Sequence, residues 1–175
     1  VILKAFAEPA MLELCTPIIY GSPKVAAYHR KSLDLPTNFS IIQAATEASQ
    51  TKLSIINCAS DAIKVEFSKP DMEAGKAALS ALERALEDYK AGVIDVLVTA
   101  PINKHTIQSE SFSFPGHTEY IEERAGNGAK SLMILLKGDF RMALVTGHIP
   151  IKEVASTITK ELIMEKLAIF NHSLK

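Results

Sequence analysis

The sequence predicts an α/β fold with a mostly parallel sheet, because short apolar strands alternate with helices along the chain. The clearest helix begins after Asp71, where alanine and leucine recur at helical spacing, and Gly92 closes it as a left-handed cap. A buried strand is predicted directly after this helix, at 93–98. A hairpin turn at 137–139 adds some antiparallel pairing.

Local signals define the other elements. Pro9 breaks a helical start, and Ser22 caps a helix that has Pro23 at its first position. Further strands are expected at 16–22, 39–43, 53–57, 131–136 and 142–145. Further helices are expected at 1–7, 10–14, 23–33 and 118–124, two more begin at 150 and 159, and 99–116 is expected to be a long loop.

The composition indicates a globular cytosolic protein. Apolar residues make up 47 % and charged residues 22 %, which excludes a disordered chain. The net charge of -1 and the mixed signs exclude a nucleic-acid-binding stripe, and no apolar run reaches the ~18 residues of a membrane helix. The N-terminus does not resemble a secretory signal. Cys15 and Cys58 lie in apolar contexts and are expected to be buried thiols.

Three polar segments each follow a predicted strand, at the place where open α/β sheets bind ligands. In the first, 98–104, a Pro-stiffened turn leads to Asn103 and Lys104. Lys104 could bind an anionic substrate or stabilise an oxyanion. Taken alone, however, the segment favours an ordinary surface lysine.

The second segment, 114–120, places His117 and Thr118 at the start of a predicted helix, after the flexible Gly116. Unpaired amide groups at a helix N-terminus and two side-chain donors suit a phosphate. The alternative is that Thr118 only caps the helix, while the glutamates that follow favour its dipole. The residues alone leave these two interpretations balanced.

The third segment, 144–150, places His148 between a strand and a helix start, where an imidazole could bind a divalent metal. One histidine is not a metal site, and no second ligand stands at a recognisable spacing. The segment alone therefore favours a structural histidine. The remaining histidines, His29, His105 and His172, are expected to be loop or surface residues.

As an ordered set, the three segments are similar to those of the 4-hydroxythreonine-4-phosphate dehydrogenase family of pyridoxal phosphate (vitamin B6) biosynthesis. The resemblance covers essentially all 175 residues, and the opening at 1–5 looks like the family's first helix. The Gly-Asp-Pro segment that normally precedes that helix is absent. Since the chain starts at Val1 and stops at Lys175 inside a predicted helix, we expect an interior piece of a longer protein.

The resemblance implies an architecture like that of isocitrate and isopropylmalate dehydrogenases, with two α/β domains in a homodimer and the active site in the cleft. Residues 1–125 would form most of the first domain, without its N-terminal strand and loop. Residues 126–175 would begin the second, dimerisation-side domain, whose C-terminal half is missing.

The implied reaction is NAD- or NADP-dependent oxidation and decarboxylation of a phosphorylated hydroxy amino acid, with zinc, magnesium or cobalt as a Lewis acid. His117 and Thr118 match the family's substrate-binding pair, and Lys104 matches a lysine that we assign to the same site. His148 matches the first of three metal-binding histidines. The other two, and most NAD contacts, would lie beyond Lys175, with the metal site at the subunit interface, so the chain alone is expected to be inactive.

Two alternatives compete with this interpretation. A phosphate acyltransferase-like enzyme shares a related architecture and would bind phosphate or coenzyme A in place of NAD. A non-catalytic phosphate-binding or dimerisation module would keep the fold without the chemistry. The resemblance assigns no residue of this chain to the chemical step itself.

Overall fold

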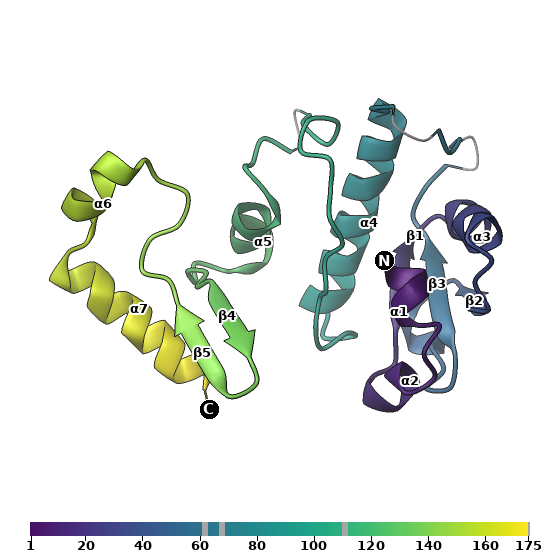
Figure 1. The fold of residues 1–175 in the computed structure, drawn as a ribbon, viewed down its shortest axis with the longest axis horizontal. Helices are drawn as coiled ribbons and strands as arrows, with labels where there is room; N and C mark the ends of the chain where they lie inside the picture. Colours follow the sequence, from purple (N-terminus) through teal and green to yellow (C-terminus); the bar gives the residue numbers. More distant parts are fainter. Residues whose placement is uncertain (61–62, 67–68, 110–111, 175) are drawn as a thin grey trace. The chain divides into compact units, whose positions relative to one another are not determined.

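The computed structural model describes residues 1–60, 63–66, 69–109 and 112–174. The chain divides into two compact units, Val1–Ile121 and Glu122–Lys175, and the boundary falls inside one helix, α5 (His117–Ala125). Each unit is described separately below, and Figure 1 labels the elements of both.

The first unit is built on a three-stranded parallel sheet. Its strands are β1 (Ile18–Gly21), β2 (Phe39–Ile42) and β3 (Leu53–Asn57), in the order β1-β3-β2. The central strand β3 is buried from Leu53 to Ile56, and Ile55 is fully buried. Burial is expected for a strand with neighbours on both edges and with both faces covered. The predicted parallel sheet is confirmed.

Helices cover this sheet on both sides in Figure 1. They are α1 (Ile2–Ala5), α2 (Met11–Leu14), α3 (Pro23–Ser32) and α4 (Met72–Lys90), with a short 3-10 turn at Ala45–Glu47. The hydroxyl of Ser22 accepts a 3.2 Å hydrogen bond from the Val25 amide, and Asp71 accepts a 2.9 Å bond from Glu73. These side chains satisfy amide groups that a helix start leaves unpaired. The predicted cap at Ser22 is therefore confirmed, and the structure adds a cap at Asp71.

The long helix α4 packs against β1 through an apolar stripe. Leu79, Leu82 and Leu86 on this stripe are all less than a tenth exposed. Gly92 follows the helix with a φ of 69°, a conformation that glycine adopts without steric cost. The predicted left-handed cap is therefore confirmed.

The strand predicted at 93–98 is wrong for the structure. These residues form no strand, and the side chains of Val96 and Val98 are 71 % and 87 % exposed. A strand needs a neighbour whose backbone groups complete its hydrogen bonds. No strand within the described ranges pairs with this segment, although Ile94 packs against the core beside β1.

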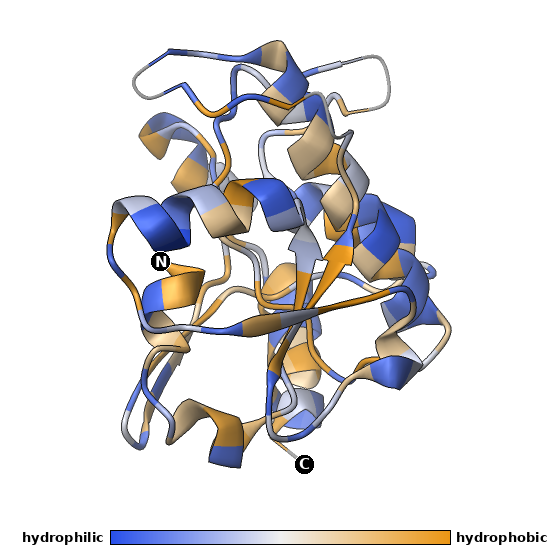
Figure 2. Ribbon diagram, turned by 90° about the vertical axis from the view of Figure 1, so that its right-hand side faces the viewer, coloured by the Kyte–Doolittle hydropathy of each residue, from blue (hydrophilic) through white to orange (hydrophobic). Residues whose placement is uncertain are grey.

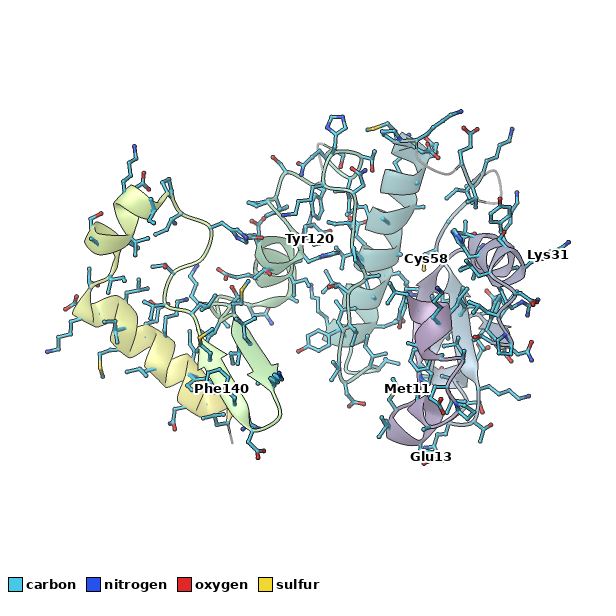
Figure 3. The ribbon with its side chains drawn as sticks, viewed as in Figure 1. Met11, Glu13, Lys31, Cys58, Tyr120 and Phe140 are labelled. Carbon is cyan, nitrogen blue, oxygen red and sulfur yellow. The ribbon has the colours of Figure 1, made fainter. Side chains whose placement is uncertain are left out.

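The expectation of two buried thiols is wrong for Cys15. Cys15 is exposed because it ends the four-residue helix α2, which buries no residue. Cys58 is partly buried, and both thiols are free. Cys58 follows β3 directly and is labelled in Figure 3. Burial raises the pKa of the Cys58 thiol.

The second unit contains the predicted antiparallel hairpin. Strand β4 (Ile134–Lys137) pairs with β5 (Phe140–Ala143), and Gly138 at the turn has a φ of 56°. The β4 strand begins three residues later than predicted. Helices α6 (Ile151–Thr157) and α7 (Lys160–Ser173) follow the hairpin, and the Thr159 hydroxyl caps α7 by accepting from the Leu162 amide.

The helices have mixed polarity. Figure 2 shows blue and orange residues together along them. Over the residues described, none of the helices is long and apolar enough to cross a membrane.

Candidate functional site

The loop predicted at 99–116 begins with a turn that presents Lys104. The Asn103 side-chain oxygen accepts hydrogen bonds from the amides of His105 (3.0 Å) and Thr106 (3.1 Å). Asparagine favours turns because its side chain can bond the backbone two residues ahead. The turn leaves Lys104 exposed while Thr106 is buried. The Lys104 ammonium is therefore accessible to solvent, while the backbone next to it is packed.

This turn rests against α4. A Cβ atom on Gly75 would overlap the backbone carbonyl of Thr106, so only glycine permits the approach that is seen. Ile107, the next residue, is 2 % exposed. The Lys104 turn is therefore fixed on the first half of α4 by backbone contact.

The second half of the loop closes on an aromatic cluster. The Gln108 amide nitrogen donates a 3.0 Å hydrogen bond to the carbonyl of Phe114. The rings of Phe112, Phe114 and Tyr120 lie within 5.7 Å of one another between centroids. The Tyr120 hydroxyl also donates a 3.2 Å hydrogen bond to Glu83 of α4. Figure 3 labels Tyr120 on α5.

His117 and Thr118 form the first turn of α5, as predicted. His117 is partly buried and Thr118 is exposed. Burial lowers the pKa of His117, and the nearby ammonium of Lys104 lowers it further. Lys104 thus lies within electrostatic range of His117, 13 positions further along the sequence, at a helix start that favours anions.

His148 belongs to the second unit, between β5 and α6, and is exposed. In the described part of the chain, no group of three or more His, Cys, Asp or Glu side chains could hold a metal ion. These residues by themselves therefore do not fit a metal centre. The predicted metal role of His148 stays a prediction.

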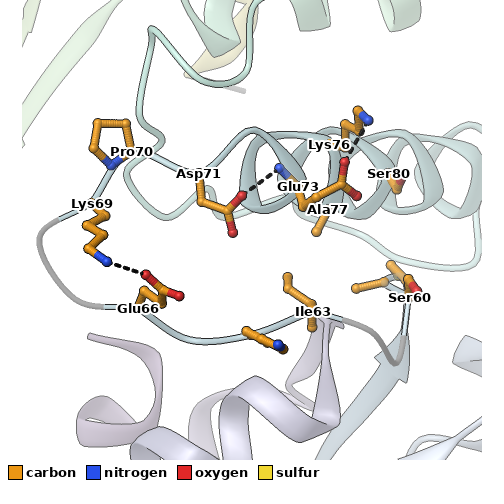
Figure 4. A pocket seen from close by; sticks show the side chains of 13 residues that line it. Ser60, Ile63, Glu66, Lys69, Pro70, Asp71, Glu73, Lys76, Ala77 and Ser80 are labelled. Atoms are coloured by element: carbon orange, nitrogen blue, oxygen red, sulfur yellow. Dashed lines mark hydrogen bonds and ion pairs between the residues drawn. The ribbon is translucent and has the colours of Figure 1, made fainter.

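Sequence reasoning did not single out the cavity shown in Figure 4. It has a volume of about 490 Å³ and lies between the segment that follows β3 and the first turns of α4. Its rim carries the exposed ion pairs Lys69–Glu66 (2.8 Å) and Lys76–Glu73 (2.7 Å). The cap residue Asp71 and the carboxyl end of β3 were the only sequence signals for it. None of the predicted site residues lines it.

The parallel sheet, the helix start with its His–Thr pair and the nearby lysine define an α/β protein with a candidate anion-binding site. The family model described as "Pyridoxal phosphate biosynthetic protein PdxA" matches residues 13–175. The chain belongs to this family, which confirms the resemblance inferred from the three segments.

Individual relatives agree with this assignment. The chain is 74 % identical over 175 residues to the 4-hydroxythreonine-4-phosphate dehydrogenase of Bacteroides thetaiotaomicron, covering 100 % of the chain and 48 % of that relative. It is 34 % identical over 158 residues to the enzyme of the same name from Sulfurihydrogenibium sp., covering 90 % and 48 %. The chain thus spans about half the length of these relatives.

The fold of this chain also matches that of solved crystal structures. A crystal structure of a 4-hydroxythreonine-4-phosphate dehydrogenase from Burkholderia phymatum superposes with a TM-score of 0.85 at 26 % identity. The match covers 99 % of this chain and 53 % of that chain. The predicted α/β class is therefore confirmed.

Proposed function

We propose that the protein containing this chain is an NAD-dependent dehydrogenase that oxidises and decarboxylates 4-phosphohydroxy-L-threonine to 3-amino-2-oxopropyl phosphate. The observation that carries the proposal is that His117 stands at the start of α5 with the ammonium of Lys104 near enough to lower its pKa. A cation beside a helix N-terminus favours a phosphorylated or carboxylated substrate. Family membership then selects the substrate that the names of the relatives give.

Each of the three residues has a role in this proposal. Lys104 supplies a positive charge toward the anionic substrate. Thr118 supplies an exposed hydroxyl on the same helix turn as His117. Because its pKa is lowered, His117 is a neutral imidazole at physiological pH and offers one N–H donor and one acceptor nitrogen.

The proposal assigns the missing groups to the rest of the protein. His148 would supply one ligand to zinc, magnesium or cobalt, while two further histidines and most contacts to NAD or NADP would come from outside this chain. The metal would polarise the substrate's alcohol and carboxylate. The assembly would be a homodimer of isocitrate dehydrogenase-like subunits, with 1–125 in the first domain and 126–175 in the second.

The test follows NADH formation from 4-phosphohydroxythreonine by the full-length protein, with and without a divalent metal, after its intact mass is checked. Metal-dependent turnover is expected from the full-length protein, and none from a verified 19.0 kDa chain. An absorbance change at the nicotinamide wavelength separates a dehydrogenase from a phosphate acyltransferase. No turnover by the full-length protein would reject the proposed substrate and favour a binding role.

Substitutions test whether His117 and Thr118 belong to the substrate-binding site. His117→Asn and Thr118→Ala are expected to raise KM for the phosphorylated substrate by about tenfold each, the loss of one or two hydrogen bonds to a charged group. The matched control is His105→Asn, which changes an exposed histidine in the same loop. Equal KM values for the control and for His117→Asn would remove His117 from the site.

A further inference from the structure

Tyr120 links the first turn of α5 to α4. It is 1 % exposed and lies three residues after His117, so both belong to one helical turn. Its ring lies 4.8 Å from that of Phe112 and 5.2 Å from that of Phe114. Its hydroxyl donates to Glu83 at 3.2 Å across 37 residues of sequence. The ring therefore fills the core, and the hydroxyl adds one directional contact to a different helix.

The same helix also holds the Lys104 turn. Gly75 of α4 lies against the backbone of Thr106, two residues after Lys104. Gly75 and Glu83 are eight residues apart on α4, which corresponds to about 12 Å along one face of the helix. Helix α4 therefore acts as a rigid support with two attachment points. One fixes the turn that carries Lys104, and the other fixes the turn that carries His117.

We propose that Tyr120 is a positioning residue, whose hydroxyl bond to Glu83 holds the first turn of α5 so that His117 stays within electrostatic reach of Lys104. The role in substrate binding rests on the proposed function, but the geometric role does not. Because Tyr120 is 1 % exposed, its proposed role is to position α5 and not to touch the substrate. The alternative is a tyrosine that contributes only to the stability of the core.

The first readout is the titration of His117, followed by NMR in the full-length protein with labelled histidine. Tyr120→Phe keeps the ring and removes the hydroxyl, so the pKa of His117 is expected to rise as the Lys104 ammonium moves away. In a Lys104→Met background, Tyr120→Phe is expected to leave the pKa of His117 unchanged, because the coupling is already gone. A purely structural tyrosine predicts no difference between the two backgrounds.

The second readout is substrate binding. Tyr120→Phe and Glu83→Ala are each expected to raise KM about threefold to tenfold with kcat within twofold, the effect of one lost hydrogen bond. The double variant is expected to be no worse than either single one, since both remove the same contact. Glu83→Gln keeps an acceptor for the Tyr120 hydroxyl and is expected to restore the wild-type KM.

The matched control is Tyr20→Phe, which removes a tyrosine hydroxyl bonded to Asp88 of α4, where the helix faces β1. It is expected to lower stability without moving the pKa of His117. An unchanged His117 pKa in Tyr120→Phe, or additive KM effects of Tyr120→Phe and Glu83→Ala, would overturn the positioning role. If the wild-type protein does not turn over at all, the proposed function fails, and the titration still decides the positioning role.

Discussion

The Tyr20 hydroxyl donates a 2.7 Å hydrogen bond to the Asp88 carboxylate, which lies 68 residues further along the chain. The bond joins β1 to the last turns of α4, and the Arg84 guanidinium lies 3.6 Å from the same carboxylate oxygen. Burial raises the pKa of the Tyr20 phenol, and Asp88 raises it further. The sheet and its longest helix are thus joined by a polar contact as well as by apolar packing.

Removing this hydroxyl is expected to destabilise the first unit. Tyr20→Phe should lower the free energy of unfolding by about 1–3 kcal/mol, because Asp88 loses its donor in a partly buried place. The difference in the free energy of unfolding between this variant and wild type is expected to have its full size below pH 10.0, the usual phenol pKa. It should shrink above that pH, because the Tyr20 phenol of the unfolded wild-type chain then deprotonates. Thermal unfolding at several pH values measures this. Tyr89→Phe, at an exposed tyrosine of α4, is the control, and equal midpoints for the two variants would contradict the role of the contact.

The close approach at Gly75 gives a second prediction. Gly75→Ala adds a methyl group that overlaps the Thr106 carbonyl, so either the loop or the helix must move. We expect a loss of about 2–4 kcal/mol in stability and a weaker Lys104–His117 coupling. Gly21→Ala is the matched control, because its methyl group would meet only the Ile19 side chain at an ordinary 3.8 Å. Similar thermal midpoints for both variants would show that the Gly75 contact tolerates a side chain.

Local sequence signals were sufficient to predict most helices and strands, but not to predict which strands pair. Ser22 caps its helix as predicted, because a cap depends only on residues within one turn. The helices expected after Asp71 and at Thr159 also begin there, and these two side chains cap them. The prediction of a strand at 93–98 was wrong, because it relied on the apolar residues of the segment alone. A strand also needs a neighbouring strand to pair with, and that neighbour is not visible in the segment's own sequence. The prediction that Cys15 is buried was wrong for a similar reason. Apolar neighbours in the sequence do not guarantee that another helix or strand covers the side chain.

In the candidate site, too, local signals predicted single residues but not the contacts between distant segments. The motifs predicted Lys104 and His117 one at a time, Lys104 at the end of the segment 98–104 and His117 within the segment 114–120. The Lys104 turn contacts α4 through Thr106 and α5 contacts it through Tyr120, and neither contact has a sequence pattern. Burial at 1 % and the hydroxyl bond are what distinguish Tyr120 from any other aromatic residue of a helix.

The charge of Lys104 gives a third prediction. A neighbouring cation disfavours the protonated imidazole, so Lys104→Met is expected to raise the pKa of His117 toward its usual 6.5. Lys104→Arg keeps the charge and should leave the pKa low. Histidine NMR titration of the full-length protein measures both. An unchanged pKa in Lys104→Met would leave burial as the sole cause of the lowered value.

The fourth prediction concerns Glu122 in the second unit. Its carboxylate accepts from the Ser131 hydroxyl (2.6 Å) and amide (2.9 Å) and pairs with Lys130 at 3.0 Å. These contacts, with the Ser131 hydroxyl first, lower the pKa of Glu122 from 4.5 to about 2. Because the folded pKa is the lower one, the stabilisation is present above pH 4.5 and is lost as the pH falls toward about 2.

Glu122→Ala is therefore expected to speed hydrogen exchange at the Ser131 amide near neutral pH, by an amount equivalent to about 1–3 kcal/mol of local stability. The difference in exchange rate from wild type should shrink as the pH falls from 4.5 toward about 2, because the wild-type carboxylate becomes protonated over that range. Glu123→Ala, at the exposed glutamate beside it, should leave the exchange unchanged. A Glu122→Ala effect that persists undiminished at the acidic end would mean that packing, and not the charge of the carboxylate, holds the start of the 131–137 segment to α5.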